Sequence, residues 1–472
     1  MLDRLFRLRE HNTTVRTELL AGLTTFLTMA YIIFLQPAIL TGSTSGTMTG
    51  MDYGSVMTAT CLAAALATLI MGLYANYPIG QAPGMGENIF FVLSVIPAAA
   101  AVAGPESSAW QVALGVVFVA GVLFLVLSLI GVRRMILSSI SPSMRNAIAV
   151  GIGLFIAYLG LKQAHVLMVE HDGLALNPEF MSPDFLIFAF GLALTAGLFA
   201  RKVRGAIIWG ILAATLLAVG LKLGADWLPA DWVHSAAFST SDLAQRFAVA
   251  DGVVAKPPSI APTFWQMDLR AALSWAMAPY ILIFLFMDLF DTLGTLVGVS
   301  ERAGLMKDGE LPRARQALMS DAVGTVAGAA MGTSTVTSYI ESTAGVEQGG
   351  RTGLTAVAVA VLFLVALFFE PIVRMVGGYP AITAPALVIV GSMMMQNVRK
   401  IEWDDYTESL PAFLAIIGIP LTESIADGLA IGFISYPVIK VLGGRGREVS
   451  RLMAIMAAIL VVYFFLVRPQ AG

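Results

Sequence analysis

The sequence predicts an all-α polytopic membrane protein, and three observations carry this prediction. Hydrophobic residues make up 57% of the 472 residues and charged residues only 12%, whereas an ordinary soluble domain has about 25% charged residues. Apolar runs of about the ~20 residues that cross a bilayer follow one another along the chain. Charged residues gather at the ends of these runs. The formal net charge of -3 indicates no nucleic acid or other polyanion as a partner.

Hydropathy alone gives twelve candidate spanning helices. They cover residues 15–40, 54–74, 110–131, 144–163, 183–200, 205–222, 269–293, 318–332, 354–373, 380–396, 408–421 and 424–441. Residues 80–97 and 334–348 are also apolar, but Gly, Pro, Ser and Thr interrupt them. Irregular backbone at membrane depth is tolerated only where protein or a watery cavity covers it. We therefore expect these two to be buried, discontinuous segments, which raises the count to fourteen.

Three further stretches complete the chain. Residues 1–14 are too charged for a cleaved signal peptide and are expected to be a cytoplasmic lead-in. Residues 223–268, rich in Trp and Pro, are expected to form an extracytoplasmic cover. Within the C-terminal tail, 442–472, the apolar run 453–467 is short and could span the membrane or lie in its interface.

Basic residues predict the orientation, because Lys and Arg accumulate on the cytoplasmic side. All of their groups fall on one side if both broken segments count as crossings, which places the N-terminus inside and the protein in the cytoplasmic membrane. These groups are Arg4, Arg7, Arg9 and Arg16; Arg133, Arg134 and Arg145; Arg201, Lys202 and Arg204; Arg302, Lys307, Arg313 and Arg315; Arg351; Arg399 and Lys400; and Lys440, Arg445, Arg447 and Arg451.

The two broken segments occupy corresponding positions in the chain. Each is third in a set of seven, in residues 15–222 and 269–441, and an odd number of crossings makes the two halves inverted. Paired interrupted segments of this kind indicate a binding site near the bilayer midplane of a transporter. No residue-level repeat is visible, so this prediction depends on hydropathy and spacing.

Cysteine and histidine indicate no metal or redox chemistry. Cys61 lies in an apolar run and is expected to pack in the core. The histidines, His11, His165, His171 and His234, lie in polar flanks or loops. Neither residue type forms a cluster with the spacing of metal ligands, so no metal and no cofactor is expected.

An acidic pair lies in MDLFDTLGT, residues 287–295. Asp288 and Asp291 are three residues apart, which places them on neighbouring positions of one helical face, beside Thr292 and Thr295. Two carboxylates this close in low dielectric do not both ionise easily, so one can hold a proton. The alternative is that only Asp291 faces a cavity, while Asp288 caps or pairs with a backbone group.

Other positions receive structural expectations. Gly294 and Gly298, four residues apart, predict close helix approach. Asp321 is expected to cap the helix that begins there, and Glu423 to lie at a turn.

A second acid, Glu341, lies in STVTSYIESTAGVEQGGRTG, residues 334–353. An ionisable side chain at membrane depth costs at least ~2.5–3.5 kcal/mol, so its default interpretation is a substrate or ion site. A short helix is expected to begin near Tyr339, where a ligand would meet backbone amides and the positive end of the dipole. The alternative is that Glu341 only compensates the helix start. Glu347 and Arg351 are expected to pair. The hydroxyl groups before the helix belong to Ser334, Thr335, Thr337 and Ser338.

The third segment is GQAPGMGENIFF, residues 80–91. Its prolines and glycines prevent a regular helix and let backbone approach a ligand. Asn88 offers an acceptor and two donors. Phe90 and Phe91 could stack on a planar heterocycle, although packing is the alternative for each.

These three segments, with NTTVRTELLAGLTTFLTMAYIIFLQPAIL near the N-terminus, resemble the adenine/guanine/hypoxanthine permeases of the azaguanine-transporter type, within the nucleobase–ascorbate transporter superfamily. The resemblance covers nearly the whole chain, through YPAITAPALVIVGSMM at 379–394 and LPAFLAIIGIPLTESIADGLAIGFISY at 410–436. It implies fourteen spans in two inverted sevens and short antiparallel strands in the third and tenth segments. It also implies a core domain of spans 1–4 and 8–11, a gate domain of spans 5–7 and 12–14, and proton-coupled uptake by an elevator movement, usually as a homodimer.

The resemblance also implies site residues. The eighth-span acid of the superfamily falls on Asp291, the tenth-span acid on Glu341 and the third-span amide on Asn88. In the family these positions bind the nucleobase edge, and one carboxylate is tied to the proton. Glu87 departs from the pattern, because related permeases usually have an apolar residue there, and an extra carboxylate can shift substrate choice or proton coupling.

The sequence therefore predicts a proton-coupled purine transporter in the bilayer. A uracil or xanthine carrier is a close alternative. An anion transporter is another, since helix ends suit anions, but acids lining the site argue against it. A polytopic membrane enzyme would need a metal-site spacing that is absent. The predicted substrate-binding residues are Glu341, Asp291, Asn88, Glu87, Phe90, Phe91, Ser338, Thr337 and Tyr339, and the predicted proton-coupling residues are Asp291, Glu341 and Asp288.

Overall fold

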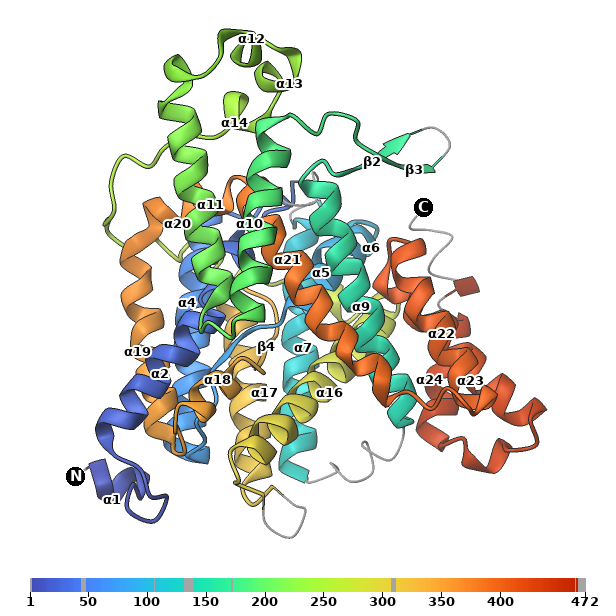
Figure 1. Ribbon diagram of the computed structural model, residues 1–472. Helices are drawn as coiled ribbons and strands as arrows, with labels where there is room; N and C mark the ends of the chain where they lie inside the picture. Colours follow the sequence, from blue (N-terminus) through green and yellow to red (C-terminus); the bar gives the residue numbers. More distant parts are fainter. Residues whose placement is uncertain are drawn as a thin grey trace.

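Long helices make up most of the protein, as Figure 1 shows. The computed structural model describes residues 2–43, 48–105, 107–130, 140–170, 173–306, 311–462 and 464–465. Arg133, Arg134, Lys307 and His171 lie outside the described residues, as does the end of the predicted apolar tail. Ten helical units in the described part of the chain have the length and composition to cross a membrane. The count of fourteen and the inverted repeat stay predictions.

The first half contains the short α1 (Leu2–Phe6) and six long helical units. The predicted span 15–40 consists of two consecutive helices, because the chain turns at Ala30. The units are α2 (Val15–Met29) with α3 (Tyr31–Leu40), α4 (Tyr53–Ile70), α7 (Ala109–Ile130), α9 (Pro142–Gln163), α10 (Pro183–Ala200) and α11 (Ala206–Leu223).

Side-chain caps fix where several of these helices begin. Thr14, Asp52, Ser141 and Ser182 each lie at an N-cap, where the side-chain oxygen accepts a hydrogen bond from a backbone N–H of the first turn. Such caps satisfy amide groups that would otherwise lack a partner at the helix start. Helices therefore begin within about two residues of the hydropathy boundaries.

The second half is also helical. The predicted span 269–293 is displaced: a single turn, α15 (Leu269–Ala272), is capped by Asp268, and the long helix starts only at Ala278. The helices of this half are α16 (Ala278–Arg302), α17 (Ala314–Met331), α19 (Gly353–Ala366), α20 (Glu370–Gly377), α21 (Pro380–Met394), α22 (Tyr406–Leu421), α23 (Ile425–Leu442) and α24 (Arg451–Val462). Glu423 lies in the turn between α22 and α23, as predicted.

The two broken segments meet each other inside the protein. The first contains β1 (Gln81–Pro83), α5 (Met85–Phe90) and α6 (Ile96–Ala100), and the second contains β4 (Val336–Ser338) and α18 (Ser342–Glu347). β1 and β4 pair antiparallel, with Ala82 opposite Thr337, and both strands are fully buried. The strands implied by the family resemblance are therefore present. The helix expected near Tyr339 begins three residues later, at Ser342.

Residues 223–268 and an additional hairpin cover one end of the protein (Figure 1). This cover contains the short helices α12 (Ala230–Val233), α13 (Ala236–Ser239) and α14 (Asp242–Gln245). The hairpin of β2 (Leu167–Glu170) and β3 (Gly173–Leu176) was not predicted.

Polar contacts of α14 hold the cover against α10 and the residues that follow α9. Asp184 of α10 accepts hydrogen bonds from the backbone N–H groups of Asp242 and Leu243 at 2.8 and 3.1 Å. His165 Nε2 lies 3.5 Å from Asp242 Oδ2, and its hydrogen bond to Asp242 raises the pKa of His165.

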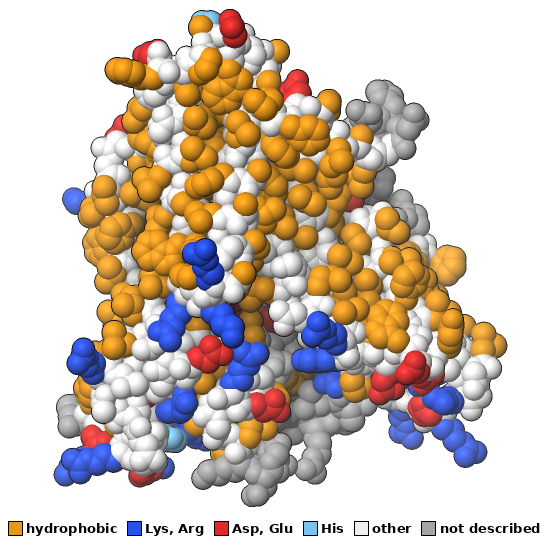
Figure 2. All heavy atoms as spheres, in the orientation of Figure 1, with side chains coloured by type: hydrophobic (Ala, Val, Ile, Leu, Met, Phe, Trp, Pro, Cys, Tyr) orange, Lys and Arg blue, Asp and Glu red, His pale blue; other side chains and the backbone are white. Residues whose placement is uncertain are grey.

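Basic side chains gather in the lower half of the face shown in Figure 2, below a broad band of hydrophobic side chains. Figure 1 places α1 and the C-terminal end of α16 on the same side. This agrees with the expectation that the Lys and Arg groups share one side. That this side is cytoplasmic stays a prediction.

Candidate functional site

A cavity of about 1070 Å³ lies where the two broken segments meet α16. Its walls also include α9, α21, α23 and α24, so both halves of the chain and the C-terminal tail contribute to it. Arg145, Arg302, Arg399 and Lys400 are among the lining residues. Because these belong to the basic groups predicted to be cytoplasmic, the cavity extends toward that side of the protein.

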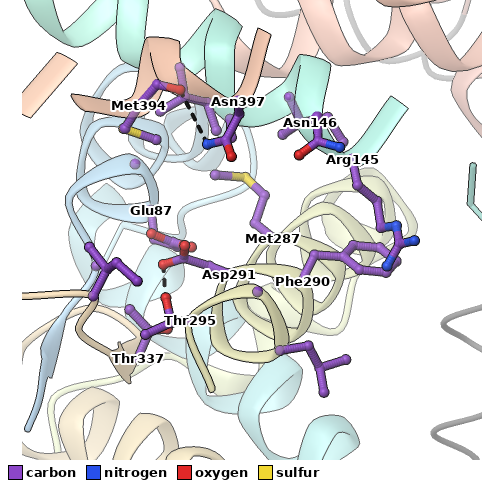
Figure 3. A pocket seen from close by; sticks show the side chains of 18 of the residues that line it. Glu87, Arg145, Asn146, Met287, Phe290, Asp291, Thr295, Thr337, Met394 and Asn397 are labelled. Carbon is purple, nitrogen blue, oxygen red and sulfur yellow. Dashed lines mark hydrogen bonds between the residues drawn. The ribbon is translucent and has the colours of Figure 1, made fainter. Parts of the chain in front are cut away.

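Four acids line this cavity: Glu87 of α5, Asp291 and Glu301 of α16, and Glu341 before α18. Three of them, Glu87, Asp291 and Glu341, are predicted site residues and come from different segments. Asp291 is exposed because it faces the cavity, whereas Glu87 is buried. Figure 3 shows the carboxyl groups of Glu87 and Asp291 directed toward one another. Within the described residues, no Lys, Arg or His forms an ion pair with any of the three. The cavity is therefore rich in hydrogen-bond acceptors that have no positive partner.

Glu341 is held in place by a tyrosine that the sequence analysis missed. The hydroxyl of Tyr31, at the start of α3, donates a hydrogen bond to Glu341 Oε1 at 2.7 Å and also lines the cavity. Thr28 Oγ1 donates to the backbone carbonyl of Glu341 at 3.3 Å. These contacts fix the carboxyl group from the first spanning unit, although the two segments are about 310 residues apart.

Asp288 and Asp291 have different surroundings. Asp288 is buried, and its Oδ2 accepts a hydrogen bond from Thr325 Oγ1 of α17 at 2.9 Å. Only Asp291 lines the cavity. Of the two acids, Asp291 alone faces the cavity, which agrees with the alternative stated for this pair. The partner of Asp288, however, is a side-chain hydroxyl and not a backbone group.

The prediction that Asp321 caps a helix is wrong. α17 begins at Ala314, about two turns earlier, so Asp321 lies in the helix interior and is fully buried. Its Oδ2 accepts hydrogen bonds from Gln81 Nε2, Thr292 Oγ1 and Ser338 Oγ at 3.1, 2.5 and 3.2 Å. Asp321 thus joins β1, α16 and β4 directly behind the cavity wall.

Asn88 also lies behind this wall. Its amide is fully buried, donates to Gln36 Oε1 and accepts from Ser334 Oγ, and it is not among the cavity-lining residues. Gln36 Nε2 in turn donates to Thr333 Oγ1 at 2.9 Å. In this conformation Asn88 connects α3, α5 and the segment before β4.

Phe90 and Phe91 do not supply the expected stacking surface. Both are fully buried and neither lines the cavity, and the ring of Phe90 packs edge-on against Phe284 at 4.8 Å between centroids. The phenylalanine rings that line it are Phe286 and Phe290 of α16 and Phe433 of α23. The four-residue spacing of the two on α16, beside the acidic pair, was a signal that the sequence analysis did not use.

Thr337, Ser338 and Tyr339, which are predicted to bind the substrate, line the cavity. Gly294 and Gly298 line it as well, with another role than the close helix approach expected of them. A Cβ atom on Gly294 would meet nothing within 4 Å, and one on Gly298 would meet only Ile340 at 3.5 Å. These glycines widen the cavity and do not bring helices together. The close-approach prediction is therefore wrong.

Two further expectations concern charged groups. Glu347 pairs with Arg302 at 3.5 Å, and Arg351 donates to backbone carbonyls of Val346 and Gly350, so the predicted Glu347–Arg351 pair is wrong. Among the residues that the structure describes, no group of three or more His, Cys, Asp or Glu side chains has a metal-binding arrangement.

Comparison with known proteins identifies related sequences over almost the entire chain. A family model described as "Permease family" matches residues 16–431. The chain is 46% identical over 464 residues to a putative permease of Methanocaldococcus jannaschii, with 98% of each chain covered. It is 40% identical to the adenine permease AdeP of Escherichia coli, covering 98% of this chain and 95% of that one. It is 38% identical to the guanine/hypoxanthine permease PbuO of Bacillus subtilis, covering 98% and 100%.

Solved structures show a related fold. The transmembrane domain of the cyanobacterial bicarbonate transporter BicA matches with a TM-score of 0.58 at 15% sequence identity, covering 88% of this chain and 96% of that chain. At this identity the likeness concerns the fold alone.

Proposed function

Because the chain belongs to the permease family, we propose that it takes up a purine nucleobase, namely adenine, guanine or hypoxanthine, across the cytoplasmic membrane. The family and the relatives are transporters and not enzymes, which removes the membrane-enzyme alternative. The observation that carries the proposal is the convergence of Glu87, Asp291 and Glu341 on one cavity, where none of the three forms an ion pair with a described basic residue. These three carboxyl groups disfavour an anion bound directly beside them.

The cavity suits a purine on chemical grounds. A purine is neutral, planar and rimmed with hydrogen-bond donors and acceptors, and carboxylates can replace the water that its ring N–H groups lose. In our proposal Glu341, oriented by Tyr31, binds the base edge, and Asp291 shares binding and proton duty. Phe286 and Phe290 provide apolar surface for the ring faces. Glu87 adds a third acceptor that can influence which purine is preferred.

Proton coupling and an elevator movement belong to the same proposal. A protonated, loaded carrier crosses a low-dielectric barrier more easily than an ionised one. The packing supports two bodies of the kind that the family resemblance implies. α2, α4, α7, α17 and α19 make their main contacts among themselves, and α9, α10, α11, α21, α22 and α23 form the other group. We propose that the first group carries the substrate against the second, in a homodimer.

The test is uptake of radiolabelled bases by the purified protein in liposomes. We expect adenine, guanine or hypoxanthine to accumulate when an inward proton gradient is imposed, and an uncoupler to abolish the accumulation. Competition by uracil, xanthine, sulfate and bicarbonate distinguishes the alternatives. If no purine enters faster than in protein-free liposomes, or if bicarbonate or sulfate is the species transported, the proposal is refuted.

A further inference from the structure

A row of hydrogen-bonding groups leads from the cavity into the buried core. Thr337 Oγ1 lies 3.4 Å from Asp291 Oδ2 at the cavity wall. It also lies 2.9 Å from Thr292 Oγ1, and Thr292 Oγ1 lies 2.5 Å from Asp321 Oδ2. Thr292 and Asp321 are fully buried and do not line the cavity. The row therefore connects a carboxyl group that a substrate can reach with one that it cannot.

The row lacks one proton when both of its aspartates are ionised. Four oxygen atoms form three consecutive contacts, but the two threonine hydroxyls supply only two protons. With both aspartates ionised, one of the three contacts joins two oxygens with no hydrogen between them. One additional proton, on either aspartate, completes all three hydrogen bonds. The row can then point in one direction or the other, and hydrogen bonds in a chain strengthen one another.

Two features of the surroundings of Asp321 favour a bound proton, and they oppose the three donors to its Oδ2, which favour the ionised form. No cation pairs with it among the described residues, and Asp321 Oδ1 has no hydrogen-bond partner. Oδ1 of Asp288 on α16 also has no hydrogen-bond partner. The charged groups that face Asp321 are acidic, namely Asp288, Asp291 and Glu87. An uncompensated buried carboxylate is costly, and neighbouring acids add to that cost.

We propose that Thr337 and Thr292 form a proton relay, and that Asp321 holds the coupling proton behind the substrate cavity. This inference rests on the proposed function. The proton of Asp291 passes to Thr337 Oγ1 while the Thr337 proton passes to Thr292 and the Thr292 proton to Asp321. One O–H bond breaks at Asp291 and one forms at Asp321, and both hydroxyls are regenerated.

The relay explains how one molecule can carry a base and a proton together. Asp291 accepts an N–H of the base more strongly when its own carboxyl group is ionised, because the hydrogen bond is then charge-assisted. Base binding therefore drives the proton along the row to Asp321, where it neutralises a buried charge during the movement. In the reverse arrangement, with the proton on Asp291, the base is released.

The test compares two kinds of transport in liposomes: exchange of external for internal labelled base, and accumulation driven by an inward proton gradient. With one proton per base, a gradient of one pH unit supports about tenfold accumulation. Thr292→Val keeps the shape of the side chain and removes the hydroxyl. We expect it to retain exchange and lose accumulation, whereas Thr292→Ser retains both.

A matched control is Thr60→Val. Thr60 is a fully buried threonine of α4 whose hydroxyl donates to the carbonyl of Val56 at 2.7 Å, outside the row, so both kinds of transport should persist. If Thr292→Val does not fold, Asp321→Asn carries the test, because the amide imitates a permanently neutral side chain. It too should exchange without accumulating.

Two results overturn the relay. One is accumulation at the wild-type level in Thr292→Val. The other is loss of exchange together with accumulation in Thr292→Val and Asp321→Asn while Thr60→Val retains both, because these groups would then build the base site itself. Failure of the proposed function is recognised separately, since the wild-type protein would then exchange no purine. Exchange without gradient-driven accumulation in the wild type removes the coupling and the relay with it.

Discussion

Glu341→Gln retains the shape of a cavity-lining side chain and removes its charge. In the wild type, Tyr31 donates a hydrogen bond to Glu341 Oε1 at 2.7 Å, and the carboxylate is proposed to accept an N–H of the base. Glutamine replaces one acceptor oxygen by an N–H donor and carries no charge. The carboxamide therefore cannot accept charge-assisted hydrogen bonds from both the Tyr31 hydroxyl and the N–H of the base.

The expected loss follows from the strength of such contacts. A hydrogen bond to a charged group contributes ~1.5–3 kcal/mol, which corresponds to binding about 10- to 140-fold weaker at ~1.4 kcal/mol per factor of ten. Tyr31→Phe leaves the charged acceptor and removes only the hydroxyl that orients it, so a smaller loss of about 0.5–1.5 kcal/mol, or roughly 2- to 12-fold, is expected. Because the two side chains touch, the double variant should lose less than the sum of the two.

The assay is equilibrium binding of radiolabelled adenine, guanine and hypoxanthine to the purified protein, with the two single variants and the double variant forming a cycle. Glu347→Gln is the matched control. It lies six residues further along and pairs with Arg302 at 3.5 Å, with 64% of its side chain exposed, and it does not line the cavity. Binding should be unchanged in this control.

Affinity in Glu341→Gln that stays within about twofold of the wild type for every purine would refute the reasoning, because the charged hydrogen bond would then be worth less than ~0.4 kcal/mol. An equal loss in Glu347→Gln would show that the effect comes from the net charge of the segment and not from a contact in the cavity.

Three further predictions follow from other parts of the fold. Gly294→Ala should raise the unfolding free energy by ~0.5–1 kcal/mol, because its methyl group meets open space in a helix, while slowing uptake by narrowing the cavity; denaturation and initial rates measure both. Lys440→Met should cost ~3 kcal/mol of stability in a thermal-denaturation assay, because it leaves the buried carboxylate of Glu408 unpaired at the end of a 2.9 Å ion pair. Contact with Asp242 raises the pKa of His165 and lowers that of Asp242. The pair therefore stabilises the cover fully at pH values below the ordinary histidine pKa of ~6.5, and this contribution is lost as the pH rises through the raised pKa of His165. His165→Gln should lower the melting temperature near pH ~5.5 and leave it unchanged at alkaline pH.

Hydropathy predicted the helices well, because a chain in lipid must satisfy its backbone within each spanning segment. Each of the twelve candidate spans corresponds to a helix or a consecutive pair of helices. The two broken segments were also recognised physically, from Gly and Pro in apolar surroundings. Their pairing as strands came only from the family resemblance, since strands of three residues leave no periodic pattern to detect.

The direction in which side chains face was predicted less well. In a helix that is apolar on every side, no amphipathic pattern marks which face meets a cavity. Phe90 and Phe91 were therefore predicted as stacking residues, whereas Phe286 and Phe290 line the cavity. Asp321 was assigned to a helix start because the apolar run begins only at residue 318, although α17 begins at Ala314. Tyr31 was missed because only the fold brings it to Glu341.

The pairing of β1 with β4 has a consequence for how the protein is made. The partner of β1 is encoded about 250 residues downstream, so a ribosome adding ~5–20 residues per second completes the first strand at least ten seconds before its partner exists. During that interval the polar groups of residues 81–88 must be sheltered in the membrane without the strand that later satisfies them. A polypeptide interrupted before residue 336 would thus leave the backbone hydrogen-bonding groups of β1 without their partner strand. These unpaired groups distinguish an unfinished molecule from a complete one.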